Sequence, residues 1–169
     1  MVEPSVRDAL RALSERDLAV RAGLRAEGEL DGGYHPRMEA VHRENAEQLR
    51  QLIADHGWPH EGIAGVDGAE AAWLVAQHAI GEPDFLRACR DLVAVEAEAG
   101  RVPRWQHAYL DDRVRVFEGR LQRYGTQLDL TPDGPRPCPV EDPHGLDERR
   151  RAQERAWRER VGWVAGPDG

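Results

Sequence analysis

The chain has 169 residues, of which 40% are hydrophobic, and a formal net charge of -8. This length allows a hydrophobic core without disulfide or metal support, and the acidic balance disfavours nucleic acid, which needs a net basic face. No run approaches the ~20 apolar residues of a membrane span, and the N-terminal residues lack the basic-then-apolar order of a signal peptide. We therefore expect a cytoplasmic protein that binds neither nucleic acid nor a membrane.

Residue types that are rare or absent in this chain limit the catalytic chemistry that it could perform. All 23 basic residues are arginine, which excludes Schiff-base lysines and the phosphate-loop lysine. The only serines, Ser5 and Ser14, lie near the N-terminus, and Cys89 and Cys138 are too far apart in sequence to suggest a disulfide framework. Acid–base work would therefore fall on His, Asp, Glu, Tyr or a cysteine.

The first half of the sequence predicts helices. An amphipathic pattern covers about residues 5–29, and a second helix runs from Pro36, a favoured first-turn residue, to about residue 55. Residues 58–68 contain three glycines and are expected to form a loop. The segment 69–80 is apolar nearly all round, which predicts a buried central helix.

The second half predicts more helices and an irregular insert. Helical patterns cover about residues 84–99 and 103–118, and a charged helix covers about 146–160. Between them we expect an extended segment, a proline-containing turn and a short edge strand, at residues 122–128, 131–135 and 137–140. The sequence thus predicts a single compact all-α domain of about five to six helices over residues 1–165. A short irregular or β-hairpin insert lies near 122–140, and residues 166–169 are expected to be disordered.

Polar residues interrupt the apolar faces of three predicted helices. Asn45 stands in a stripe of apolar residues, Asp112 takes a position where leucine would be expected, and Gln77 and His78 end the most apolar stretch. Buried polar groups are costly unless they are satisfied. Three helices that direct such groups inward predict either a hydrogen-bond network that only stabilises the fold or a reaction site.

The reaction-site interpretation assigns a role to each group. His78 would be the general acid/base, Asp112 would orient or charge-balance it, and Arg113 would anchor an anionic group. Gln122, Tyr124, Thr126 and Gln127 surround Gly125 in a segment that suits a recognition loop, although a polar surface strand is the equal alternative. The expected substrate-binding residues are Asn45, Gln77, Tyr109, Arg113, Gln122, Tyr124, Thr126 and Gln127.

A metal site is less favoured by the sequence. No HExxH, CxxC or paired ExxH motif occurs, and Gly57 and Pro59 prevent His56 and His60 from sharing a helical face. We expect no cofactor. If a metal binds, the sequence points to His42, His78 and Asp112 as its ligands.

Several motifs together resemble a known family. These are the strings Trp73–Ala79, Ala108–Val114 and Gln122–Gln127, followed by Glu141-Asp142-Pro143 and Asp147–Arg150. They are similar to an uncharacterised bacterial family of unknown function, over about residues 41–150. The resemblance implies no activity, but its hallmark polar residues coincide with those selected above.

The sequence therefore favours a cofactor-independent enzyme that performs hydrolysis, elimination or isomerisation on a small molecule. The alternative is a non-enzymatic helical binding protein of the sensor or immunity type, in which the polar cluster only fixes the fold. A metal-dependent hydrolase ranks third. A small-molecule ligand is the expected partner, and a homodimer is compatible with the sequence.

Overall fold

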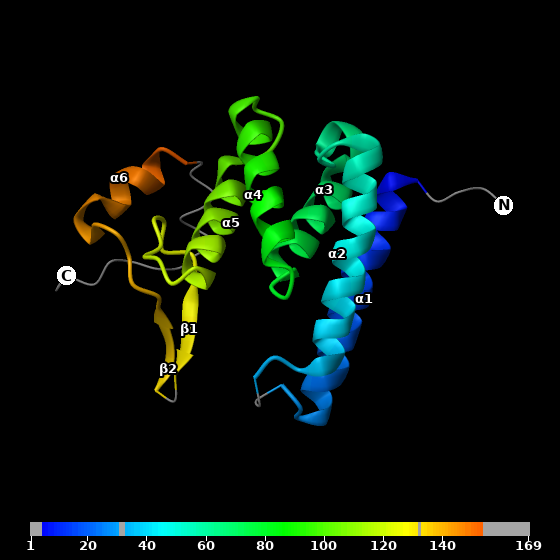
Figure 1. Ribbon diagram of the computed structural model, residues 1–169, viewed down its shortest axis with the longest axis horizontal. Coiled ribbons are helices and arrows are strands. Elements are labelled where there is room, and N and C mark those ends of the chain that lie inside the picture. The colour runs from blue at the N-terminus through cyan, green and yellow to red at the C-terminus, as the bar shows by residue number, and fades with distance from the viewer. Residues whose placement is uncertain (1–4, 31–32, 132, 154–169) are drawn as a thin grey trace. The chain divides into compact units, whose positions relative to one another are not determined.

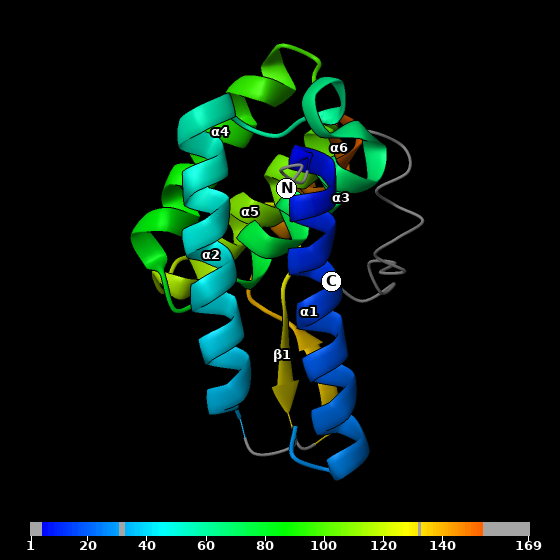
Figure 2. The same cartoon turned by 90° about the vertical axis from the view of Figure 1, so that its right-hand side faces the viewer.

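The computed structural model describes residues 5–30, 33–131 and 133–153, which form six α-helices, one 3-10 helix and a two-stranded antiparallel sheet (Figures 1 and 2). The expected all-α fold with a β-hairpin insert is confirmed. The elements are α1 (Val6–Glu27), α2 (Pro36–His56), α3 (Glu61–His78), α4 (Pro83–Glu98), α5 (Arg104–Phe117), β1 (Leu128–Thr131), β2 (Gly134–Pro137), η1 (Pro143–Gly145) and α6 (Leu146–Arg151).

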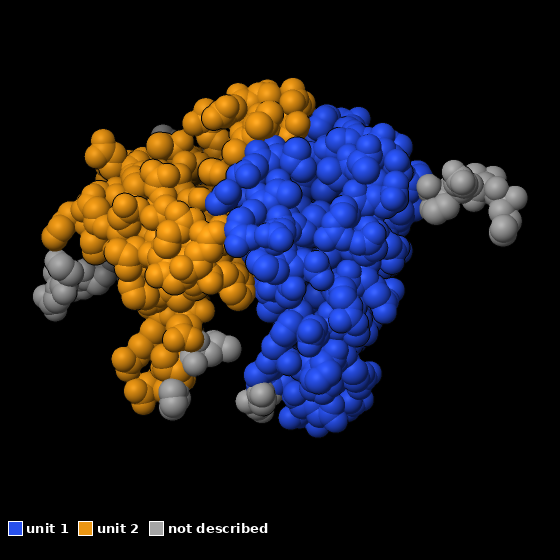
Figure 3. Space-filling view, viewed as in Figure 1, with its two compact units in different colours: residues 1–92 blue, residues 93–169 orange. Residues whose placement is uncertain are grey.

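The chain divides into two compact units, residues 1–92 and 93–169 (Figure 3). The boundary falls inside α4, so unit 1 holds α1, α2, α3 and the start of α4, and unit 2 holds the remaining elements. A single domain over residues 1–165 stays a prediction.

Unit 1 is built on a hairpin of two long helices. Helices α1 and α2 lie side by side in opposite directions, and α3 contacts both (Figures 1 and 2). Ser5 caps α1, where its hydroxyl accepts a hydrogen bond from the backbone N–H of Asp8 at 3.2 Å. Pro36 occupies the first turn of α2, as the sequence predicts. The buried apolar residues of this unit include Leu10, Leu13, Leu24, Met38, Leu49, Trp58, Val75 and Leu86.

Helices α1 and α3 approach closely at Gly68. A Cβ atom at this position would lie 2.9 Å from the Cβ of Ala64 and 3.3 Å from the Cα of Arg7. The Arg7 guanidinium also forms an ion pair with Asp67, with Nε 2.7 Å from Oδ1. The absence of a side chain at Gly68 therefore lets the two backbones meet near the N-terminal end of α1.

Helix α3 begins earlier than the sequence predicts. Residues 61–68 were expected in a loop, but the imidazole of His60 accepts from the backbone N–H of Gly62 at 3.0 Å and starts a helical turn at Glu61. Gly65 has φ 68° and ψ 173°, which interrupts this first turn before the apolar helix continues. The glycines that suggested a loop thus produce a kink, since the cap and the following apolar residues sustain the helix on either side.

Unit 2 carries the hairpin. Strand β1 pairs with β2 from Leu128 opposite Pro137 to Thr131 opposite Gly134. The predicted extended segment 122–128 is instead mostly a loop, tied by one isolated bridge between Gln122 and Val140. Helix α6 ends at Arg151 within the described residues, and the predicted helical residues 154–160 and the predicted disordered residues 166–169 lie outside them.

In the described ranges, none of the helices combines the length and the apolar character that a membrane crossing requires.

Candidate acid–base site

Asp17 is a carboxylate inside the core of unit 1. The buried residues of α1 are Leu10, Leu13, Asp17 and Leu24, and their spacing of three, four and seven residues places them on one helical face. Only 1% of Asp17 is exposed. A charged group at such a position needs hydrogen-bond or ionic partners, and two histidines of unit 1 provide them.

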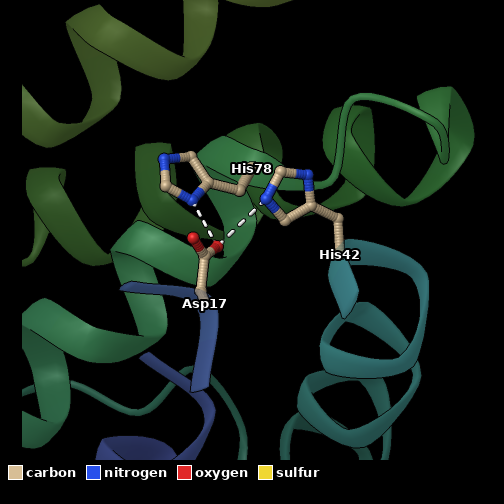
Figure 4. A group of neighbouring side chains, drawn as sticks. All are labelled: Asp17, His42 and His78. Carbon is tan, nitrogen blue, oxygen red and sulfur yellow. Dashed lines mark hydrogen bonds and ion pairs between the residues drawn. The ribbon is translucent and has the colours of Figure 1, made fainter. Parts of the chain in front are cut away.

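His78, the last residue of α3, is the first partner. Its Nδ1 lies 2.6 Å from Oδ2 of Asp17, and its other ring nitrogen points away from the carboxylate (Figure 4). With Nδ1–H donating to Asp17, a neutral imidazole presents Nε2 as a hydrogen-bond acceptor. The side chain is 20% exposed. Asp17 therefore fixes the orientation of His78 and leaves its outer nitrogen able to accept a proton.

His42 on α2 is the second partner. Its Nε2 lies 3.1 Å from the same oxygen of Asp17, and its Nδ1 lies 2.7 Å from the hydroxyl of Tyr34 (Figure 4). The Tyr34 and His42 rings stack with centroids 5.6 Å apart, and the two imidazole centroids are 5.1 Å apart. Tyr34, His42, Asp17 and His78 thus form one continuous polar chain across three helices and the loop before α2.

The surroundings set the charge of this cluster. Burial alone would raise the pKa of Asp17, but the close contact with His42 and the hydrogen bond with His78 hold it well below its usual range. Burial lowers the pKa of His78, although Asp17 acts in the opposite direction. Burial also raises the pKa of Tyr34 to about 12, which keeps its hydroxyl protonated. The arrangement is therefore an ionised carboxylate between two imidazoles.

Two atoms of the cluster have no hydrogen-bond partner within the described part of the chain. These are Nε2 of His42, whose contact with Asp17 lacks hydrogen-bond geometry, and Oδ1 of Asp17. The nearest cation to Oδ1 is Arg21, whose Nε lies 3.7 Å away. Oδ2 of Asp17 consequently carries both histidine contacts, while Oδ1 has the more distant Arg21 guanidinium as its ion-pair partner in the described part of the chain.

A small pocket adjoins the cluster on the side of His42. Its volume is ≈ 100 Å³, and it is formed by the start of α2 and the connection between α3 and α4. Its lining consists of Tyr34, Glu39, His42, Arg43, Ala79, Gly81 and Glu82. His42 thus belongs both to the pocket wall and to the buried polar chain.

Asp112 has a different set of partners from the one predicted. Its carboxylate accepts hydrogen bonds from the backbone N–H groups of Arg123, Tyr124 and Thr126 at 2.6, 3.0 and 3.0 Å, and from the Thr126 hydroxyl at 3.0 Å. Burial raises its pKa, against these hydrogen bonds, which lower it. The carboxylate that orients His78 is therefore Asp17, and Asp112 holds the loop that follows α5.

The other polar residues of this loop strengthen the same arrangement. The Gln122 side chain donates to the carbonyls of Gln127 and Cys138 and accepts from the backbone N–H of Gln127. Arg150 of α6, which is buried, donates to the carbonyl of Tyr124 at 2.9 Å. Most of the hallmark residues in unit 2 therefore form a connected structural network around residues 122–127.

The remaining predicted residues fall into the two units. In unit 1, the Asn45 side chain donates to the carbonyl of Leu13 at 2.9 Å and joins α2 to α1, and Gln77 is buried next to His78. In unit 2, Tyr109 meets the Trp105 ring edge-to-face, with centroids 5.9 Å apart, and Arg113 lies on α5 beside Asp112. A substrate-binding role for these residues stays a prediction.

Asp17 and Tyr34 are not predicted by the sequence pattern. Asp17 lies among charged residues, and the leucine that follows it, Leu18, is the residue that an apolar pattern would place inward, yet Leu18 is 53% exposed. The regular spacing of Leu10, Leu13 and Leu24 was the available signal, because Asp17 is the position that continues it. Tyr34 precedes its helix in a loop, where periodicity gives no information.

The cluster also has the composition of a metal site. One ligand atom each from Asp17, His42 and His78 lies within 4.8 Å of the others. Of the ligands that the sequence suggested for a metal, His42 and His78 are present in this group, and Asp17 takes the place assigned to Asp112.

The fold and the cluster define a helical protein with a buried His–Asp–His centre. Comparison with family models shows that the chain belongs to the family of unknown function DUF6624, whose model matches residues 4–157. This match includes α1 and hence Asp17, whereas the sequence motifs placed the start of the resemblance near residue 41. No curated protein and no solved structure matches the chain.

Proposed function

We propose that the protein is an enzyme that performs acid–base chemistry on a small molecule at the Asp17–His42–His78 cluster. The observation that carries this proposal is the buried Asp17 carboxylate, hydrogen-bonded to Nδ1 of His78 at 2.6 Å. An aspartate in this position fixes the histidine tautomer and stabilises the imidazolium that forms when the outer nitrogen takes a proton. The reaction classes that suit such a group are hydrolysis, elimination and isomerisation.

His78 is the general acid/base in this proposal, and Asp17 is its positioning residue. Nε2 of His78 removes a proton from the substrate or from water, and the ionised Asp17 compensates the charge on the ring. His42 contacts the same carboxylate oxygen as His78 through its Nε2, and the Tyr34 hydroxyl lies at hydrogen-bond distance from Nδ1 of His42 and positions that ring. A small-molecule ligand and a cytoplasmic location complete the proposal.

The ≈ 100 Å³ pocket has His42 in its wall, so a small ligand bound there would contact the cluster through His42. An enclosed apolar cavity of about 150 Å³ accommodates benzene, so this pocket suits a molecule, or part of one, with only a few non-hydrogen atoms. Its wall carries both acidic and basic side chains, Glu39, Glu82 and Arg43. Such a lining favours a polar substrate.

A panel of small esters, phosphate esters and β-hydroxy acids, followed by mass spectrometry, tests the proposal. We expect turnover by the wild type and a loss of about 10²–10⁴-fold in kcat/KM in His78→Gln. His56→Gln is the matched control, because His56 is an exposed histidine of α2 outside the cluster. Turnover that survives in a folded His78→Gln protein would refute the assignment.

A further inference from the structure

Two buried polar atoms of the Asp17–His42–His78 cluster are not satisfied by hydrogen bonds within the described residues. Nε2 of His42 and Oδ1 of Asp17 lack hydrogen-bond partners within the described residues, although their side chains are only 5% and 1% exposed. Buried polar atoms are nearly always satisfied by protein, water or an ion. A carboxylate and two imidazoles that converge from three helices are a donor set that suits a transition metal.

We propose that Asp17, His42 and His78 bind one divalent first-row transition ion, with Zn²⁺ as its representative. One ligand atom from each of the three residues lies within 4.8 Å of the others. The ring nitrogens next to the Asp17 carboxylate are Nε2 of His42 and Nδ1 of His78, and these would bind the ion together with the carboxylate. This inference rests on the proposed function only in using the same cluster as the reaction centre. It adds a cofactor and selects hydrolysis from the three reaction classes.

The contacts of His42 already match those of a metal ligand. Metal-bound histidines generally use their second ring nitrogen to donate a hydrogen bond to an oxygen, which fixes the ring. Nδ1 of His42 lies 2.7 Å from the Tyr34 hydroxyl, and Nε2 points toward Asp17 (Figure 4). With Nδ1–H donating to Tyr34, the lone pair of Nε2 is directed at the proposed ion.

The ion requires only a small rearrangement at His78. Ligand atoms around a tetrahedral zinc lie about 3.3 Å apart, given bonds of about 2.0–2.1 Å. Nδ1 of His78 is 2.6 Å from Oδ2 of Asp17, so the pair would separate by roughly 0.7 Å. Their shared proton would be released, which makes the affinity rise with pH.

Three protein ligands leave at least one coordination position for water, as in catalytic zinc sites. The bound ion lowers the pKa of that water to about 7 and yields a hydroxide at neutral pH. The hydroxide oxygen bonds to the electrophilic carbon or phosphorus of the substrate, and the bond to the leaving group breaks with its electron pair. The leaving group then takes the proton that the water released. With the ion present, His78 is a ligand and the bound water replaces it as the reacting base.

Metal titration of the full chain tests this proposal without any substrate. Protein stripped with a chelator is titrated with Zn²⁺ by calorimetry, and with Co²⁺ while the visible absorption of the tetrahedral or five-coordinate ion is recorded. We expect one ion per chain and a Kd that rises by more than about 100-fold in His42→Gln, because losing a residue that only hydrogen-bonds to a metal ligand already costs about 10–100-fold. His56→Gln is expected to bind as the wild type does. Circular dichroism confirms that each variant is folded, and Tyr34→Phe provides a milder change with an intact ligand set.

The outcomes separate the two proposals. Equal affinity in the wild type and His42→Gln, or no visible Co²⁺ spectrum, would overturn the metal site as adventitious binding. Turnover by the chelator-treated protein that is lost in His78→Gln would likewise overturn the metal inference while supporting metal-free acid–base chemistry. A tight, His42-dependent site in a protein that turns over none of the substrates would support the ion and contradict the proposed function.

Discussion

Replacement of Asp112 by asparagine distinguishes a loop-holding carboxylate from a catalytic one. In Asp112→Asn, the amide oxygen can still accept the hydrogen bonds from the backbone N–H groups of Arg123 and Tyr124. The NH₂ group, however, takes the place of the oxygen that accepts from the N–H of Thr126 at 3.0 Å in the wild type, so this N–H loses its acceptor. An unsatisfied buried donor costs about 1–3 kcal/mol, and the loss of the negative charge weakens the retained bonds. We expect a loss of about 2–3 kcal/mol in the free energy of unfolding, or roughly 4–12 °C in Tm.

Urea unfolding combined with amide hydrogen exchange measures this effect. The backbone amides of Arg123, Tyr124 and Thr126 should exchange faster in Asp112→Asn, because their common acceptor is weakened. Asp129→Asn is the control, since Asp129 is an exposed residue of β1 and its replacement should change stability by less than about 0.5 kcal/mol. If Asp112→Asn is as stable as this control and its loop amides stay protected, the structural interpretation of Asp112 is wrong.

Three further results are expected. Gly125→Ala should destabilise the protein by about 1 kcal/mol more than Gly119→Ala. Both glycines have φ near 70°, but a Cβ at Gly125 would also meet a buried guanidinium at 2.8 Å. Equal unfolding midpoints of the two variants would contradict this expectation. Tyr34→Phe leaves Nδ1 of His42 without its partner, so it should cost about 1–3 kcal/mol and shift the Nδ1 resonance of His42 in ¹⁵N NMR. An unchanged resonance would show that the hydrogen bond is absent. Iodoacetamide should modify Cys138 well before Cys89 in the folded protein, because Cys89 is fully buried and its pKa is raised to about 12. Peptide mass spectrometry measures the order of modification, and modification of Cys89 before Cys138 would contradict this expectation.

The helices were predictable because their periodicity is local. Pro36 and Gly57 bound α2 as expected, and the apolar stretch before His78 is indeed buried. The start of α3 was missed because the capping of Gly62 by His60 depends on a side-chain rotamer, which composition does not reveal. The hairpin was shifted for a related reason, since the loop at residues 122–127 is held by Asp112 from another element.

The candidate site was half predictable. Burial of His78 and Asn45 followed from their positions on apolar faces, and both are at least largely enclosed. The partner of His78 did not follow, because pairing between helices is a long-range property that a single sequence does not encode in its periodicity. Asp112 had the better local signal, an isolated carboxylate on an apolar face, but the same signal arises when a carboxylate holds a loop. Both kinds of buried aspartate occur here, one in each unit.

The close approach at Gly68 has a consequence for evolution and design. Ten residues separate Arg7 from Asp17 on α1, and ten separate Gly68 from His78 on α3. The two helices therefore run in the same direction, and the rise along each helix axis between the two contacts is the same, about 15 Å. One residue inserted anywhere along this span of α3 would rotate His78 by about 100° around the helix axis. Natural or engineered changes in length should therefore be excluded from these two ten-residue spans.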